Sequence, residues 1–152
     1  MINNMLGSLS NSRTSHDHPL ELIEAAEEMI IGSRFEVAVV TAQMACEISV
    51  ERVLKAYFSA RGLNELEAPI QDLLPSFNLG NDKIRKFYIA LTGDNISREF
   101  FWSEYKTMVK IRNTAIHSGS RIQKSQAQMA LRIAKSVIQH LKRVEQLASQ
   151  QQ

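Results

Sequence analysis

Apolar positions recur at spacings of three and four residues through most of the chain after residue 18, which is the period of helices packed by one face. These runs predict helices over residues 19–31, 35–61, 81–93, 100–119 and 122–148. Pro69, Pro75 and Gly80 interrupt the pattern, so residues 62–80 are predicted to form a loop with a short helix around residues 70–74. The pattern predicts an all-α fold.

Residues 1–18 are rich in Asn, Ser, Thr and His and show no periodicity, which predicts a disordered tail. The remainder, residues 19–149, is expected to form a single domain, because 152 residues with 44% apolar and 22% charged content suit one core. No apolar run approaches the length of a membrane-spanning helix, and the N-terminus lacks the features of a secretory signal. We therefore expect a cytoplasmic protein with no membrane partner.

The segment 35–61 is apolar on nearly every side, as is typical of a helix at the centre of a bundle. Cys46, the single cysteine, is predicted to be a core residue, and it excludes an internal disulfide or a Cys-rich metal site. We predict no metal and no cofactor. Gln43 and Glu47 lie one turn apart as polar exceptions, and Glu47 needs a basic partner from another helix.

Arg112 is the expected partner of that carboxylate, with Glu51 as the alternative acid one turn further along. Such a pair would either serve the fold alone or also tune a functional site. The surrounding segment, residues 100–119, reads FFWSEYKTMVKIRNTAIHSG. Arg112 projects there from an apolar stripe, so its guanidinium must meet a carboxylate, reach an opening in the core or face a groove between subunits.

Asn113 and His117 are helical neighbours on the adjacent flank, where Asn113 could orient the imidazole. Gly119 stands where a left-handed residue usually closes a helix, which predicts that His117 lies in the last turn within reach of solvent. Arg112 and His117 are offset by roughly 140° and about 7.5 Å of rise, so they do not converge within one helix. Two copies facing each other would bring them together, which predicts a homodimer.

Net charge is +2, but the charges are segregated along the chain. Residues 17–72 contain eleven acidic and four basic side chains. Residues 106–143 contain nine basic and no acidic ones, namely Lys106, Lys110, Arg112, Arg121, Lys124, Arg132, Lys135, Lys142 and Arg143. A positive field around a candidate phosphate-handling site favours nucleic-acid binding. The alternatives are a solvated basic face that balances the acidic helices and a surface for an acidic partner protein.

The run RNTAIH at residues 112–117, late in a helix of an all-α chain, resembles the signature of HEPN domains, small helical modules named for higher eukaryotes and prokaryotes nucleotide-binding. The likeness extends to the order of a long apolar helix, a motif helix and a basic closing helix. It implies a metal-independent endoribonuclease that acts as a dimer, with Arg112 and His117 of both subunits lining a shared cleft. A possible setting is a toxin–antitoxin or phage-defence system, with an antitoxin or other regulatory protein as partner.

In this interpretation His117 serves as general base or acid, Arg112 stabilises the phosphorane and Asn113 holds His117. The RNA-binding candidates are Lys106, Lys110 and Arg121, and the supporting carboxylates are Glu47 and Glu51. HEPN toxins paired with a nucleotidyltransferase carry a Tyr two residues after the His, where this chain has Gly119, so that mode of control is not carried over. The alternative function is an inactive HEPN dimer that binds nucleotides or a protein.

Two further side chains have alternative interpretations. Trp102 and Tyr105 are predicted to be packing residues, with stacking on an unpaired base as the alternative. His140 is expected at the edge of the closing helix, with a role in a site as the alternative.

Overall fold

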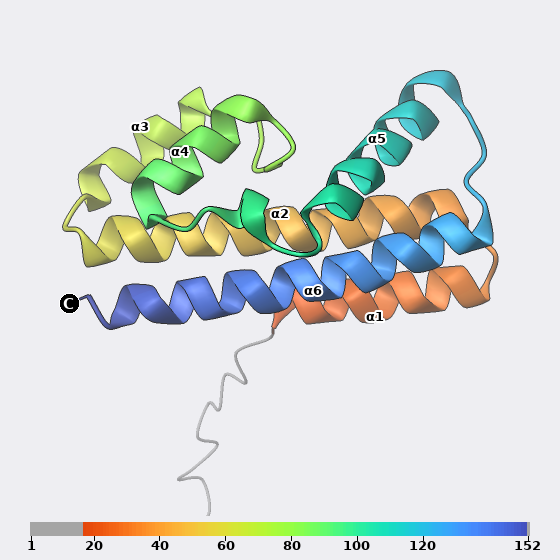
Figure 1. The fold of residues 1–152 in the computed structure, drawn as a ribbon, viewed down its shortest axis with the longest axis horizontal. Coiled ribbons are helices and arrows are strands. Elements are labelled where there is room, and N and C mark those ends of the chain that lie inside the picture. Colours follow the sequence, from red (N-terminus) through yellow and green to blue (C-terminus); the bar gives the residue numbers. More distant parts are fainter. Residues whose placement is uncertain (1–16, 152) are drawn as a thin grey trace, which may run out of the picture.

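The computed structural model describes residues 17–151 and is all-α over that range, without a strand (Figure 1). The prediction of an all-α fold is confirmed. The elements are α1 (His18–Ile31), α2 (Phe35–Ala60), α3 (Asn64–Leu73), α4 (Asp82–Thr92), the short 3₁₀ helix η1 (Ile96–Arg98), α5 (Trp102–Ser118) and α6 (Lys124–Ser149). Within the described part of the chain, every helix is too short or too polar to span a lipid bilayer.

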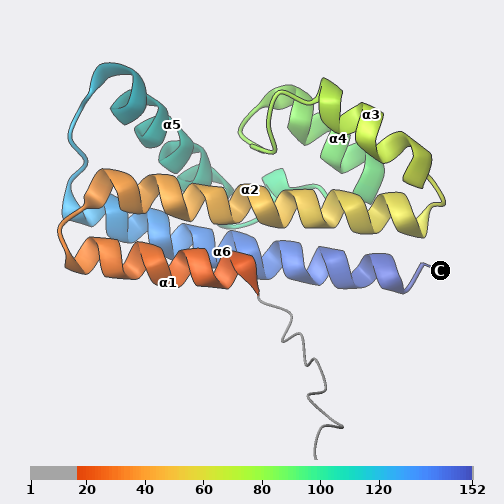
Figure 2. The same ribbon diagram turned by 180° about the vertical axis from the view of Figure 1, so that it is seen from behind.

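Helix α2 is the central element, as predicted, because it packs against α1, α3, α4, α5 and α6. It runs beside α6 along the length of the molecule, with α1 against both (Figures 1 and 2). On the other side, α5 covers its N-terminal half, and α3 and α4 cover its C-terminal half. Both long helices bury several alanines, which lets their backbones approach closely: Ala38, Ala42 and Ala45 in α2, and Ala127, Ala130 and Ala134 in α6.

The start of α1 is tied to both long helices through Asp17. Its carboxylate accepts a hydrogen bond from the Leu20 amide at 3.4 Å, which caps the helix, and it lies 3.7 Å from Arg52 of α2 and 3.6 Å from Lys142 of α6. Most of the predicted tail, residues 1–16, lies outside the described residues. His18 is already the first residue of α1.

Within residues 62–80, the predicted position of the short helix was wrong. Helix α3 begins at Asn64, six residues before the expected start, and contains Pro69 in its second turn. Two acidic side chains in the first turn, Glu65 and Glu67, favour a helix N-terminus, and Ile70 packs against the core. These contributions outweigh the backbone hydrogen bond that a proline cannot donate.

Helix α5 ends as the sequence predicts. Gly119 has φ 66° and donates its amide to the Ala115 carbonyl at 3.1 Å, so the left-handed conformation closes the helix one residue after Ser118. The helix starts at Trp102 rather than at residue 100, because Phe101 turns into the core as the preceding residue.

Core packing along α6 can be tested with two leucines of the same helix. Leu141 is fully buried, whereas Leu147 is half-exposed. We expect Leu141→Ala to lower the free energy of unfolding by about 2–5 kcal/mol, since the removed atoms leave a cavity. Leu147→Ala should change it by no more than about 0.5 kcal/mol. Urea denaturation followed by circular dichroism measures both, and equal losses would contradict this packing.

Candidate functional site

The motif residues occupy the last two turns of α5, but they point to different environments. Arg112 is directed inward, with 24% of its side chain exposed, whereas Asn113 and His117 are exposed to solvent. In the described part of the chain, no hydrogen bond joins Asn113 to His117, and the orienting role of Asn113 stays a prediction. His117 itself has no hydrogen-bond or ion-pair partner among residues 17–151, so its imidazole is available to a ligand.

Arg112 faces Glu47 of α2, which confirms the predicted pairing. Its Nη1 lies 4.0 Å from Glu47 Oε1, whereas Glu51 pairs with Lys55 of its own helix at 3.4 Å. Burial raises the pKa of Glu47 above its ordinary value, and the nearby guanidinium offsets part of this effect. A separation of 4.0 Å is the outer limit of an ion pair, so Arg112 is held near Glu47 without being locked by short hydrogen bonds.

Polar atoms without a hydrogen-bond partner lie on the side of α2 that faces α5. The Nε of Arg112 is buried without a hydrogen-bond partner, and so are both polar side-chain atoms of Gln43, one turn from Glu47. Buried polar groups are ordinarily paired, and exceptions concentrate where a structure serves function. The interface between α2 and α5 is therefore the part of the interior least explained by stability alone.

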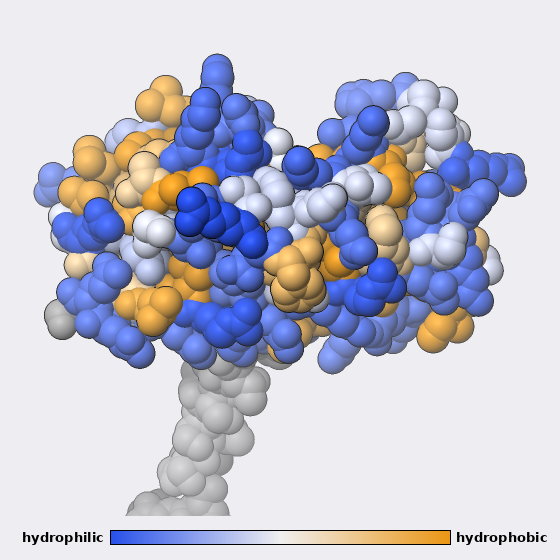
Figure 3. Space-filling model, in the orientation of Figure 1, coloured by the Kyte–Doolittle hydropathy of each residue, from blue (hydrophilic) through white to orange (hydrophobic). Residues whose placement is uncertain are grey.

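Two grooves flank the end of α5. One, of about 330 Å³, lies between α5 and the segment before α4, and its wall includes Gly80, Lys106, Lys110 and Asn113. The chain approaches α5 closely here, since a Cβ at Gly80 would lie 3.2 Å from a methyl of Val109. Figure 3 shows the surface hollowed between the lobe of α3 and α4 and the lobe of α5.

The second groove, of about 210 Å³, lies between α5 and the start of α6 and includes Lys110, Ile111, Arg121 and Ile122. A hydrogen bond from the Ile122 amide to Glu36 Oε1, 2.9 Å long, anchors this wall to α2 and lowers the pKa of Glu36. Asn113 lines the first groove, but neither of these two grooves includes Arg112 or His117 in its wall.

The nine basic residues of segment 106–143 divide into those with a carboxylate within 4.0 Å and those without one. Arg112, Arg132, Lys135 and Lys142 each lie within 4.0 Å of a carboxylate. Among the described residues, the other five of the nine have no such ion pair: Lys106, Lys110, Arg121, Lys124 and Arg143. Lys106 and Lys110 belong to α5, Arg121 lies in the segment between α5 and α6, and Lys124 is the first residue of α6. Arg121 is close enough to Glu36 to lower the pKa of that carboxyl group. Positive charge therefore remains along α5 and the start of α6, while Glu27 and Asp17 pair with Lys135 and Lys142 of α6.

The aromatic residues at the start of α5 are packing residues, as predicted. Trp102 stacks on Tyr105 with 5.3 Å between ring centroids, and the Tyr105 hydroxyl donates to Asn78 Oδ1 at 3.1 Å. The Arg85 guanidinium lies over the Trp102 ring at 5.3 Å. Both aromatic side chains are buried, so they offer no free face to a base.

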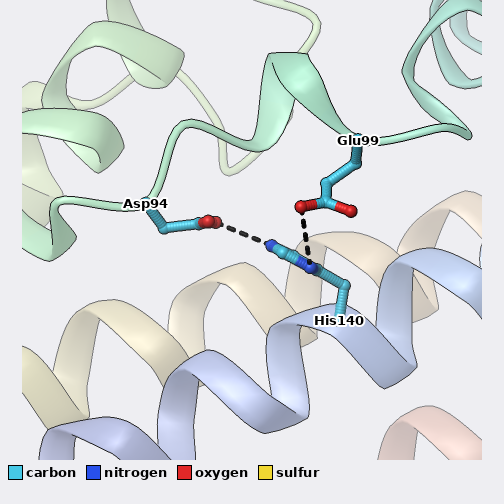
Figure 4. A group of neighbouring side chains, drawn as sticks. All are labelled: Asp94, Glu99 and His140. Atoms are coloured by element: carbon cyan, nitrogen blue, oxygen red, sulfur yellow. Dashed lines mark hydrogen bonds and ion pairs between the residues drawn. The ribbon is translucent and has the colours of Figure 1, made fainter.

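A second polar cluster lies on α6, at His140 (Figure 4). Its Nε2 donates to Asp94 Oδ2 at 2.8 Å, and its Nδ1 lies 3.8 Å from Glu99 Oε1. His140 is only 7% exposed, so its expected place at the edge of the helix was wrong. The segment that joins α4 to α5 runs beside α6 here and covers the imidazole (Figure 4). Sequence spacing offered no sign of Asp94 or Glu99, because only the path of this segment brings them to α6.

The Asp94 carboxylate is held ionised by its neighbours. It also accepts a hydrogen bond from the Tyr88 hydroxyl at 2.7 Å. Burial alone would raise the pKa of Asp94, but the hydrogen bonds from His140 and Tyr88 together bring it below its ordinary value. This carboxylate is therefore a charged acceptor shared between α4 and α6.

No family model, curated protein or solved structure matches this chain. The resemblance to HEPN domains rests on residues 112–117 and on the order of the helices around them.

The coupling between Arg112 and Glu47 can be measured directly. In Arg112→Ala the charge that lowers the pKa of Glu47 is lost, so this already raised pKa should rise further, as followed by carbon-13 NMR of the carboxyl group. A carboxyl group whose pKa is raised on folding adds stability while protonated, and that stability is lost as pH rises through the folded-state pKa. The variant should thus be destabilised more at about pH 7 than at about pH 4.

The matched control is Arg132→Ala, which removes an exposed Arg paired with Glu104. It should leave the titration of Glu47 unchanged. An Arg112→Ala protein in which the pKa of Glu47 stays the same would show that the two groups are not coupled.

Proposed function

We propose that this chain is a metal-independent endoribonuclease of the HEPN type, which cleaves single-stranded RNA as a homodimer. The observation that carries the proposal is the setting of His117: an exposed imidazole without an intramolecular partner among the described residues, in the last turn of α5. Lys106 and Lys110 lie on the same helix, Arg121 follows its end, and none of the three has an ion pair within 4.0 Å among the described residues. This combination suits proton transfer beside a phosphodiester.

The chemistry follows from the groups present. His117 of one subunit takes the proton of the ribose 2′-OH, and the 2′-oxygen attacks the neighbouring phosphorus. The bond from phosphorus to the 5′-oxygen breaks, and His117 of the partner subunit gives a proton to that oxygen. Arg112 stabilises the charge on the phosphorane oxygens through its planar fork of donors. The products are a 2′,3′-cyclic phosphate and a 5′-hydroxyl.

The directions of the side chains support a dimer. Within one chain, Arg112 points toward α2 and His117 is exposed to solvent, so we propose that a second copy completes the site. Apolar side chains are available to an interface: Val37 and Met44 are half-exposed on α2, with Met44 one turn before Glu47, and Ile116 is half-exposed on α5. A two-fold interface uses the same patch on both subunits, so this surface could pair with itself.

A second candidate function is supported by the contact of Arg112 with Glu47. If that ion pair persists, Arg112 is a structural residue and the domain is an inactive HEPN dimer that binds nucleotides or a partner protein. The same basic grooves would then bind phosphate groups without cleaving them. For the active enzyme, an antitoxin or other regulatory protein is the expected partner, in a toxin–antitoxin or phage-defence setting, and the cytoplasm is the expected location.

The decisive experiment is cleavage of a single-stranded RNA in excess EDTA. We expect the unmodified protein to produce ends with a 2′,3′-cyclic phosphate. His117→Ala should reduce the rate by about 100-fold or more, because proton transfer is lost, with an unchanged melting temperature. His18→Ala removes another exposed imidazole, on α1, and should retain full activity. An unmodified protein that binds RNA without cleaving it would favour the inactive dimer.

Dimerisation is tested separately by sedimentation equilibrium at micromolar concentration. We expect a dimer that Met44→Asp converts to a monomer, because the new charge would be buried in the interface. Leu66→Asp is the matched control, since this leucine is equally half-exposed but lies on α3, away from the motif. A monomeric unmodified protein, or equal effects of the two variants, would exclude the proposed interface.

A further inference from the structure

A cleft of about 700 Å³ lies between the C-terminal half of α6, the end of α2 and the segment that joins α4 to α5. Its wall includes Asp94, Glu99 and His140 (Figure 4). Each of the three offers one ligand atom, and these atoms lie within 4.8 Å of one another. We propose that Asp94, Glu99 and His140 bind a divalent transition-metal ion, such as Zn²⁺, in this cleft.

Two of the three ligand atoms are close to the spacing of a tetrahedral site, while Glu99 now faces the other ring nitrogen of His140. Donor atoms about 2.1 Å from Zn²⁺ are separated from one another by about 3.4 Å. His140 Nε2 and Asp94 Oδ2, now 2.8 Å apart, would separate by less than about 1 Å, and the ion would take the place of the proton between them. Glu99 would swing toward the ion from its present position, which its 36% exposed side chain permits.

Neighbouring side chains hold two of the ligands in place. The buried Tyr88 hydroxyl donates to Asp94 Oδ2 at 2.7 Å, and the Phe101 ring packs edge-on against the imidazole of His140 with 5.7 Å between centroids. Metal ligands are commonly oriented by such contacts, which fix the ring and the carboxylate before the ion arrives. Asp94 and His140 are thus preorganised, and Glu99 is the mobile third ligand.

The donor set also selects the kind of ion. A nearly buried imidazole favours Zn²⁺ and similar transition metals, whereas Mg²⁺ and Ca²⁺ prefer oxygen ligands alone. Three protein ligands leave a fourth position open toward the cleft. Arg143 lines the same wall and has no ion-pair partner among the described residues, so it opposes a second cation and favours an anion at the open position.

This site is separate from the proposed nuclease site. His140 lies about 20 Å along the axis of α6 from the groove beside Arg121, at 1.5 Å of rise per residue. The proposal therefore does not depend on RNA cleavage, and binding of Zn²⁺ is measured without RNA.

The test is equilibrium titration of Zn²⁺ into the EDTA-stripped full chain against a chromophoric chelator. The His-Asp-His sequence at residues 16–18 could bind Zn²⁺ by itself, so all proteins carry His16→Ala and His18→Ala. We expect one Zn²⁺ per chain, unaffected by excess Mg²⁺ or Ca²⁺. Glu99→Gln keeps the shape of the side chain and should weaken Zn²⁺ affinity by at least about tenfold.

Glu104→Gln is the matched control, because it neutralises an exposed carboxylate of α5 outside the cluster. It should bind Zn²⁺ like the parent protein. Co²⁺ provides a second readout, since the parent should show the visible absorption of a four-coordinate ion and His140→Gln should not. Absence of Zn²⁺ binding, or identical affinity in Glu99→Gln, would overturn the proposal and leave Asp94 and His140 as a structural link between α4 and α6.

Discussion

The burial of α2 on nearly all sides is the constraint on which the rest of the structure depends. An isolated helix with so little polar surface would be insoluble, so five other helices must cover it. The covering is shared: α6 runs along the length of α2, α1 runs along its N-terminal half, and the shorter helices divide the remaining side between them. The position of α5, and therefore of the motif, follows from this division, because α5 covers the half of α2 that contains Glu47.

A helix covered on most sides leaves its buried polar residues to be satisfied by the neighbours that cover it. Glu47 finds Arg112 at the limit of ion-pair distance, while Gln43 has no partner for either polar atom. A fold selected for stability alone would replace such groups with apolar side chains of similar volume. These groups lie where α5 brings Arg112 against α2, which is the side of the molecule to which we assign the proposed site.

The charged groups around α6 differ along its length. Its middle is balanced by carboxylates of α1 and α5, through Lys135 with Glu27 and Arg132 with Glu104. The end near Arg121 keeps its positive charge and suits a polyanion. Near His140, the segment after α4 instead brings the carboxylates Asp94 and Glu99 to α6, where they suit a cation. Two different kinds of ligand are therefore favoured at two places along one helix, a difference that the net charge of +2 conceals.

Periodicity determined the helical class, the central place of α2 and the end of α5 at Gly119, because each depends on contacts between residues three or four positions apart. The same local logic identified the pairing of Arg112 with Glu47, since a charge on an apolar stripe must find its opposite. Reasoning from local sequence failed at α3, where the packing of Ile70 outweighed the tendency of Pro69 to end a helix. Only the tertiary structure decided that the segment joining α4 to α5 runs beside α6, because the path of a connecting segment depends on how whole helices pack. That path buried His140 and placed Asp94 and Glu99 beside it.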